Sequence, residues 1–301
     1  MNGEQNRSGI DCDARGQGSA LDVGRQVRVQ TELHFHLLPG VDDGPADDAE
    51  AVDLARLAIA DKTSRIVTTP HVRFVEVEAL GELTARCRAV LCQAGLELEV
   101  CAGGELSPDD VASLDQTQLE LLAHGPSGGR WLLLEAPLFD GETDLDAAAE
   151  ELRRRGFGVL IGHPERSPST PRSVIRRQVA RGAVLQLNAS SLTGDHGPEA
   201  RLAAIELARS GLPFVVASDA HSPARPPRLT SAATALAAAG VDAAAVRAAV
   251  DALPEAILVH GLSAAAVRRT EAAGLRLVER ERPAPPVARS AEVFFDRGRG
   301  P

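Results

Sequence analysis

The chain has 301 residues with a formal net charge of −10, of which 44% are hydrophobic, 25% charged and 3% aromatic. The apolar fraction excludes a wholly disordered chain. With 7 Phe, one Trp and no Tyr, the core must be aliphatic. The acidic balance argues against broad nucleic-acid binding, which depends on neutralising phosphates. A local cationic site for a small phosphorylated group remains compatible with it.

The sequence predicts a cytoplasmic protein without a membrane span. No N-terminal stretch has the charged-then-apolar pattern of a signal peptide, and no apolar run approaches the ~18 residues that a transmembrane helix needs. The cysteines show no CxxC spacing, and we interpret all of them as free thiols in a reducing compartment: Cys12, Cys87, Cys92 and Cys101.

Three segments are expected: a flexible tail over residues 1–28, a catalytic domain over 29–262, and a C-terminal helix with a Pro-rich tail over 263–301. In the middle segment, β-rich runs alternate with stretches of helical period, which predicts a parallel α/β fold. The expected strands are Val27–His36, Arg65–Thr69, Leu96–Cys101, Trp131–Glu135, Gly158–Gly162, Ala183–Asn188 and Pro213–Ser218. The expected helices are Ala46–Ala60, Leu80–Ala94, Leu145–Arg155, Pro171–Arg181, Glu199–Ser210, Thr230–Ala239, Asp242–Ala252 and Ser263–Arg280.

Most of these strands end in a histidine or a carboxylate. The carboxyl ends of parallel strands converge on one face, where sites are built. His34 and His36 are two residues apart on a strand, so both side chains can reach one metal ion. Imidazole and carboxylate ligands without cysteine favour Mn, Fe or Zn. The candidates are too many for one ion and predict a cluster: His34, His36, Asp43, His71, Glu105, Glu135, His163, Asp219 and His221.

Each of these residues also has an ordinary structural interpretation. A lone histidine at a strand end is usually hydrogen-bonded within the protein, and the run from Asp42 to Pro45 is a good turn with a helix cap. The joint placement argues against this interpretation, because carboxylates crowded on one rim would repel one another without cations.

The motifs together resemble the PHP (polymerase and histidinol phosphatase) superfamily, and more narrowly its bacterial manganese-dependent protein-tyrosine phosphatases, which act with tyrosine kinases of capsular and exopolysaccharide synthesis. The resemblance spans about residues 30–262. It rests on HFHLLPGVDDGP from residue 34, TTPH from 68, GGE from 103, LLEAP from 133, GHPER from 162 and ASDAH from 217.

The resemblance implies a distorted (β/α)7 barrel of the TIM type that holds two to three Mn²⁺ ions, with Fe or Zn as alternatives. One ion would be held by His34, His36, Glu105 and Asp219. Glu105 would bridge to a second ion, held by Glu135 and His163. The third would be held by Asp43, His71 and His221, and Arg166 would be the catalytic residue that binds the substrate phosphate.

Two positions depart from the family pattern. Glu32 stands where the family usually has Asp, which is one methylene shorter and would buttress the site differently. The stretch between His71 and Glu105 is short, so we expect a reshaped loop over Val72–Leu80.

This constellation suits hydrolysis of a phosphate monoester. Bound metals lower the pKa of water towards ~7 and so supply a nucleophile, while Arg166 would stabilise the transferring phosphoryl group. Three divalent ions and four carboxylates would leave about +2 to complement a phosphate dianion. The alternatives are a small-molecule phosphatase of the histidinol-phosphate type and a non-catalytic regulatory module.

The absence of Tyr means that any phosphotyrosine must come from a partner. The resemblance implies that this partner is the Tyr-rich tail of a phosphorylated bacterial tyrosine kinase. The ring of the phosphotyrosine would pack against loop residues such as Phe74, Val75 or Leu138. No nucleic acid and no membrane insertion are expected, and the sequence leaves the oligomeric state open.

Overall fold

The computed structural model describes residues 30–138 and 144–262, and in these ranges all paired strands run parallel. One sheet has the order β1-β2-β3 and the other β4-β5-β6-β7-β8. The predicted parallel α/β class is therefore confirmed. The strands are β1 (Gln30–Phe35), β2 (Thr63–Thr68), β3 (Glu99–Ala102), β4 (Glu105–Leu106), β5 (Trp131–Glu135), β6 (Gly158–Gly162), β7 (Val184–Asn188) and β8 (Phe214–Ala217).

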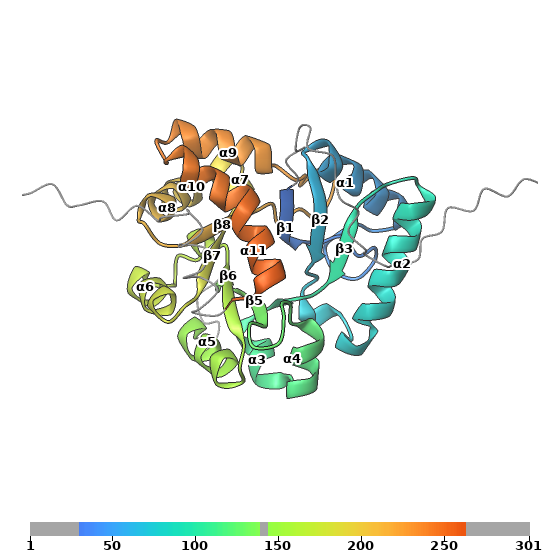
Figure 1. The fold of residues 1–301 in the computed structure, drawn as a ribbon, viewed down its shortest axis with the longest axis horizontal. Coiled ribbons are helices and arrows are strands. Elements are labelled where there is room, and N and C mark those ends of the chain that lie inside the picture. Colours follow the sequence, from blue (N-terminus) through green and yellow to red (C-terminus); the bar gives the residue numbers. More distant parts are fainter. Residues whose placement is uncertain (1–29, 139–143, 263–301) are drawn as a thin grey trace, which may run out of the picture.

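Helices surround the strands on the outside (Figure 1). Asp47 caps the first of them by accepting a hydrogen bond from the Glu50 N–H at 3.0 Å, as its position in the sequence predicts. The helices are α1 (Asp48–Ala60), α2 (Leu80–Gln93), α3 (Pro108–Ser113), α4 (Gln116–Leu122), α5 (Leu145–Arg154), α6 (Arg172–Ala180), α7 (Ala189–Thr193), α8 (Pro198–Arg209), α9 (Leu229–Ala238), α10 (Ala243–Arg247) and α11 (Leu253–His260).

Two isolated bridges connect the two sheets. Phe35 of β1 pairs with Ala220 after β8, and His71 after β2 pairs with Glu105 of β4. Between the sheets lies a small apolar cluster, which consists of Leu33, Val67, Trp131, Leu133, Leu160, Val184, Val215, Ile257 and Leu262. The Trp131 indole N–H donates to the Ile257 carbonyl at 3.2 Å, which ties α11 to this cluster. A larger cluster joins the outer faces of the strands to the helices.

A register shift in β1 turns its histidines towards the site. Glu32 pairs with Ile66 and Phe35 with Thr68, so three steps along β1 match two along β2. Such a bulge re-aims side chains, and bulges are common next to functional sites. As a result Leu33 packs between the sheets, whereas Phe35 packs against the helices.

The structure corrects several sequence expectations. Glu105 begins a short strand of the second sheet, which is absent from the seven expected strands. The helices α3 and α4 were missed, although each begins with a capping box, Ser107 with Asp110 and Asp115 with Gln118. The tails and the predicted helix Ser263–Arg280 lie outside the described residues.

The cysteines depart in part from their prediction. Cys87 and Cys101 are free thiols, whereas Cys92 is disulfide-bonded, so the expectation fails for Cys92; Cys12 lies outside the described residues. Within residues 30–138 and 144–262, none of the helices combines the length and apolar character required to cross a bilayer.

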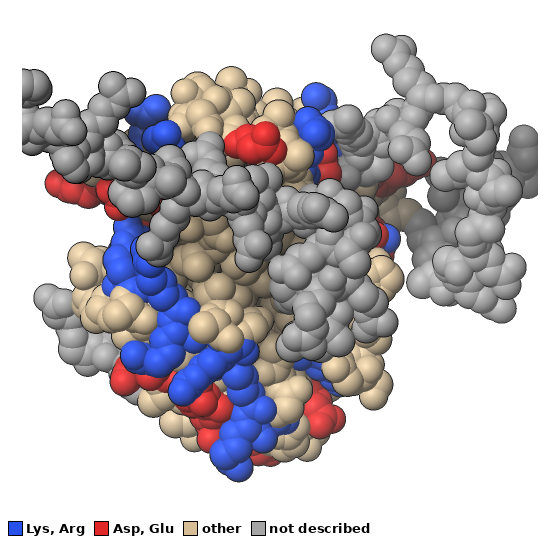
Figure 2. All heavy atoms as spheres, turned by 60° about the vertical axis from the view of Figure 1, so that its left-hand side comes forward, with Lys and Arg blue, Asp and Glu red and all other residues tan. Residues whose placement is uncertain are grey.

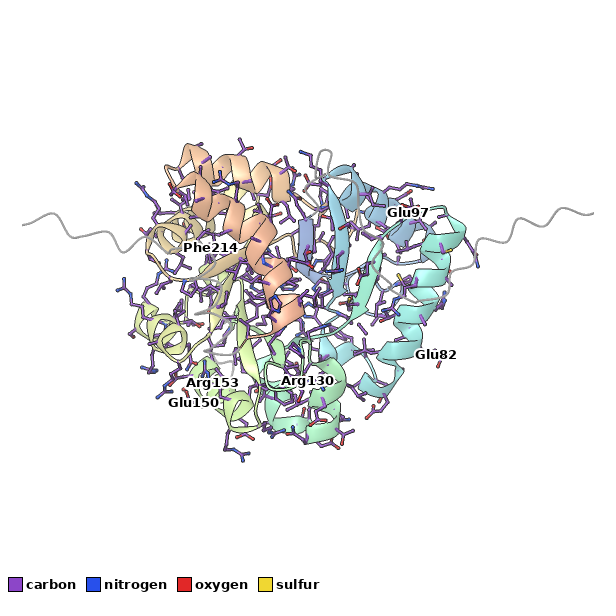
Figure 3. All side chains as sticks on the ribbon, in the orientation of Figure 1. Glu82, Glu97, Arg130, Glu150, Arg153 and Phe214 are labelled. Atoms are coloured by element: carbon purple, nitrogen blue, oxygen red, sulfur yellow. The ribbon has the colours of Figure 1, made fainter. Side chains whose placement is uncertain are left out.

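The face carrying α5, α6 and α8 shows a band of basic side chains (Figure 2). Several of its arginines are paired with acids. Glu150 and Arg153 lie together on α5 (Figure 3), 3.2 Å apart, and Arg177 of α6 is 2.8 Å from Asp146. Exposed pairs of this kind contribute little to stability. We therefore interpret this band as a solvated, ion-paired surface.

Candidate metal centre

The structure brings all nine predicted ligand residues together at the carboxyl ends of the strands. Each of them has a nitrogen or oxygen atom within 4.0 Å of another member of the set. Eight of the nine residues are buried. The ninth, Asp43 in the loop between β1 and α1, is exposed. The parallel topology explains this convergence, because each crossover returns the chain to the same end of the sheets.

Glu105 lies at the centre of the cluster. Its Oε1 is 3.3 Å from His34 Nε2 and 3.2 Å from His163 Nε2. Its Oε2 is 3.4 Å from His36 Nε2 and 3.0 Å from His71 Nδ1. One carboxylate therefore contacts four imidazoles, an arrangement that suits a group shared between cations. Glu135 Oε1 lies 3.8 Å from the same Nε2 atom of His163.

Asp219 and Asp43 complete the other side of the site. Asp219 Oδ1 lies 3.2 Å from His34 Nε2 and 3.4 Å from His36 Nε2. Asp43 Oδ1 lies 3.5 Å from His71 Nε2 and 3.3 Å from His221 Nε2. Candidate ligand atoms converge within 4.8 Å in four overlapping groups, one of which joins His36, Asp43, His71 and His221.

The donor atoms fit divalent cations. His71 Nδ1 and Glu105 Oε2 lie 3.0 Å apart without forming a hydrogen bond, and His163 Nδ1 has no hydrogen-bond partner either; leaving these buried atoms so is costly unless something else satisfies them. Imidazole nitrogens and carboxylate oxygens are the ligand set of Mn, Fe and Zn. The residues present therefore fit a cluster of such metals.

The pKa shifts of the site residues likewise indicate an environment that favours positive charge. Burial works against ionisation of His163, yet its hydrogen bond to Glu105 and the nearby carboxylates raise its pKa to about 9. Burial and the Glu105 charge raise the pKa of Glu135. The hydrogen bond from His221 lowers the pKa of Asp43. Divalent cations would replace the protons on these imidazoles, so metal binding is expected to release protons.

Arg166 is where the sequence places it, on a 3-10 turn (Pro164–Arg166) directly after His163. Its Nη1 lies 3.3 Å from Asp219 Oδ2, and its side chain is 24% exposed. A second guanidinium at the rim was missed. Arg225 Nη1 lies 3.4 Å from Asp43 Oδ2 and its Nη2 3.8 Å from Asp219 Oδ2. Its only sequence signal is its position four residues after His221.

Sequence reasoning also missed the residues that orient the ligands. Asp42 Oδ2 lies 2.6 Å from His36 Nδ1, and Gln186 Oε1 lies 3.1 Å from His34 Nδ1. Each contact leaves the Nε2 atom turned towards the cluster, as carboxylate and amide partners of ligating histidines commonly do. The Asn188 amide donates to Asp219 Oδ2 at 2.7 Å. Gln186 and Asn188 could have been noticed as polar residues at alternating positions of an apolar strand.

Backbone conformation at two ligands is unusual. His163 has φ 30° and Asp219 has φ 51°, both in the left-handed region that non-glycine residues rarely adopt. His163 directly follows β6 and Asp219 comes two residues after β8, where the chain turns over the rim. Strained positions of this kind concentrate at functional sites.

Gly103 and Gly104 let the chain reach Glu105 within a crowded corner. A Cβ on Gly104 would lie 2.7 Å from Leu122 Cδ2 and 2.8 Å from Val72 Cγ2. Real Cβ atoms do not tolerate such distances, so a side chain at Gly104 would have to push the Leu122 and Val72 side chains aside, directly next to Glu105. Packing therefore favours glycine at this position.

Glu32 supports the rim from below, as its position two residues before His34 suggested. Its side chain is fully buried, and Oε2 accepts a hydrogen bond from the Ser218 N–H at 2.8 Å. This contact joins β1 to the end of β8, next to Asp219. Burial raises the pKa of Glu32 to about 8.

The parallel α/β fold and the cluster of imidazoles and carboxylates at its rim define a metal-dependent hydrolase. Residues 30–256 match the capsular polysaccharide synthesis family CpsB/CapC. The chain belongs to this family, in agreement with the resemblance seen in its motifs.

Curated relatives cover about two thirds of the chain. The tyrosine-protein phosphatase YwqE of Bacillus subtilis (strain 168) is 28% identical over 197 residues, which are 64% of this chain and 77% of YwqE. The putative tyrosine-protein phosphatase CapC of Staphylococcus aureus is 29% identical over 202 residues, which are 64% of this chain and 76% of CapC.

Solved structures show the same relationship. A chain from the crystal structures of YwqE from Bacillus subtilis and CpsB from Streptococcus pneumoniae, described as unique metal-dependent tyrosine phosphatases, matches with a TM-score of 0.59 and 26% identity. The match covers 68% of this chain and 85% of that one. The phosphotriesterase homology protein of Escherichia coli matches with a TM-score of 0.53 at 13% identity, a likeness of fold alone.

Proposed function

We propose that this chain is a metal-dependent phosphatase that hydrolyses phosphotyrosine on a protein substrate. The observation that carries the proposal is the convergence of nine metal-type ligand residues with two guanidinium groups, Arg166 and Arg225, at one rim. The names of the YwqE and CapC relatives support the choice of phosphotyrosine as substrate.

We propose three ligand sets, two of which share Glu105, and Mn²⁺ as the preferred metal; the side-chain distances support the three sets. The first set is His34, His36, Glu105 and Asp219; the second is Glu105, Glu135 and His163; the third is Asp43, His71 and His221. Glu105 belongs to two sets because its Oε1 lies close to both His34 of the first set and His163 of the second. Two to three ions would satisfy the donors, and Fe or Zn would also suit them.

Bound divalent metals would supply a nucleophile from water at neutral pH and screen the phosphate charge. The residues of the chain do the rest. Asp42 and Gln186 hold the Nε2 atoms of His36 and His34 towards the cluster. Arg166 and Arg225 stand at its edge, where their N–H groups can donate to the phosphoryl oxygens. A phenolate leaving group, with a pKa of about 10, needs less protonation than an alkoxide.

The distorted (β/α)7 barrel is the architecture that we propose for the two sheets, with β3 and β4, which only Gly103 and Gly104 separate, counted as one strand. It is supported by the bridges Phe35–Ala220 and His71–Glu105, and by the apolar cluster between the sheets. A barrel would place every strand end around one mouth.

The proposed substrate is the Tyr-rich tail of a bacterial tyrosine kinase, as the family resemblance implies. The chain itself has no Tyr, so the phosphate must arrive on another polypeptide. An extended tail suits a rim site, because it can present one side chain at a time with little sequence readout. A cytoplasmic location is part of the same proposal.

The deciding experiment is a substrate panel with Mn-reconstituted protein. We expect phosphate release from phosphotyrosine peptides, little from phosphoserine peptides, and suppression by EDTA. A far larger kcat/KM for histidinol phosphate would replace this proposal with the small-molecule phosphatase. Absence of turnover on every monoester, with metals bound, would favour the regulatory module.

A further inference from the structure

An exposed aromatic ring stands directly beside the candidate metal centre. Phe74 lies on the 3-10 turn Val72–Phe74, which begins immediately after His71. Its residue surface is 57% exposed, whereas the other Phe and Trp residues that the structure describes are at most 6% exposed. Burial of Val72, at 5% exposure, anchors the turn in the core and keeps Phe74 at the rim. Leaving a large apolar ring in water at this one place needs an explanation.

Two neighbours hold the ring in place. The Phe74 and His71 ring centroids are 6.2 Å apart, with the planes at 74°, an edge-to-face contact. The guanidinium carbon of Arg73 lies 4.9 Å from the Phe74 ring centroid. The same guanidinium is 3.9 Å from Glu135 Oε2 in the cluster. Phe74 is thus connected on both sides to residues of the metal centre.

We propose that Phe74, positioned by Arg73 and His71, is the aromatic wall that receives the phenyl ring of an aryl phosphate. This inference rests on the proposed phosphatase function and names a determinant of its specificity. A substrate whose phosphate lies in the cluster extends its ester group out over the rim. A phenyl ring at this position gains an aromatic contact with Phe74, and an alkyl group lacks the flat face that this contact requires. Phe74 therefore favours phosphotyrosine over phosphoserine through binding and orientation.

The test compares Phe74→Ala with the wild type on three substrates: a phosphotyrosine peptide, p-nitrophenyl phosphate and a phosphoserine peptide, each with Mn-reconstituted protein. We expect kcat/KM to fall roughly 3- to 10-fold on both aryl substrates, mainly through KM, and to stay unchanged on phosphoserine. Phe74→Trp should restore the aryl preference. Leu202→Ala is the matched control, since Leu202 is 61% exposed on α8. Metal content, measured for every variant, reports damage to the cluster.

Each other outcome has a definite meaning. Equal losses on all three substrates would overturn the inference, because Phe74 would then support the site rather than contact the ring. A loss on the peptide but not on p-nitrophenyl phosphate would also overturn it and would indicate contact with the surrounding polypeptide. No change on any substrate would refute it directly. If the wild type hydrolysed phosphoserine well and aryl phosphates not at all, the proposed function would fail first.

Discussion

Nδ1 of His36 lies 2.6 Å from Oδ2 of Asp42, and neither side chain is accessible to solvent. The same oxygen accepts a hydrogen bond from the His71 N–H at 3.0 Å, and Oδ1 accepts one from the Gly44 N–H at 3.0 Å. Asp42 therefore fixes the ring of one candidate ligand and the backbone of another. Burial opposes its ionisation, but the hydrogen bond and charge of His36, together with the backbone N–H groups of His71 and Gly44, outweigh burial and lower the pKa of Asp42.

Asp42→Asn should weaken metal binding without unfolding the protein. An amide can donate to His36 Nδ1, which moves the imidazole proton to Nε2, the atom that faces Glu105. Loss of such an orienting partner typically costs ~10–100-fold in metal affinity or activity. Metal titration of the apoprotein measures this loss of affinity. Asp53→Asn, at an exposed position on α1, is the control. An unchanged affinity with lower stability would show that Asp42 only shapes its loop.

Glu105→Gln should remove more metal than Glu135→Gln. Glu105 contacts four imidazoles, whereas among the histidines Glu135 contacts His163 alone, at 3.8 Å. A carboxylate shared between two ions lowers the occupancy of both when it is neutralised. Elemental analysis after Mn reconstitution should show that the Glu105 variant loses more than one equivalent per chain. Equal losses in the two variants would contradict the bridging role.

Arg166→Ala and Arg225→Ala should each fold and retain metal but turn over slowly. Removing one preorganised donor to a transition state typically costs ~10²–10³ in rate. Steady-state kinetics with a phosphotyrosine peptide, together with Tm and metal content, tests this expectation. Arg172→Ala is the control, because Arg172 forms a surface pair with Glu206 at 3.5 Å. A fall in Tm with an unchanged kcat would indicate that Arg166 serves only to neutralise Asp219.

Elements with a continuous apolar run were predictable from sequence. The bounds of β5 (Trp131–Glu135) and β6 (Gly158–Gly162) agree with prediction, since both runs are buried and sharply delimited by polar or glycine residues. The sequence predicted that Glu105 lies close to the other candidate ligands, where the structure has it, but predicted no strand there. Its two-residue strand pairs with Leu133 and Leu134 of β5, and so short a segment has no periodicity to read.

The candidate ligands were predictable where they stand at the end of a strand. His34, His163 and Asp219 come at such ends, and parallel topology brings the ends together whatever the loops do. Arg225 and Asp42 were not predictable in this way. Their roles depend on how two loops fold back over the rim, and an acidic pair such as Asp42 and Asp43 does not reveal which member faces which histidine. Such contacts are decided by tertiary packing.

His124 lies half-buried near the opposite end of β5 from Glu135. Its backbone pairs with Trp131, and its Nε2 has no hydrogen-bond partner. Burial, reinforced by the Arg130 cation, lowers its pKa from the ordinary 6.5 to about 4. Between pH 6.5 and about 4, His124 is protonated in the unfolded chain but neutral in the folded chain. The free energy of unfolding therefore falls as the pH falls through this range.

At ~1.4 kcal/mol per pH unit, lowering the pH from 6.5 to 5 should cost about 2 kcal/mol through His124. His124→Phe should remove this part of the pH dependence, because an apolar ring needs no partner beside Trp131. Urea unfolding at both pH values measures it as the difference between wild type and variant, which cancels the protonation of the candidate ligands. His260→Phe, at an exposed position on α11, is the matched control. If the His124 variant lost as much stability as the wild type, another group would be responsible for the acid sensitivity.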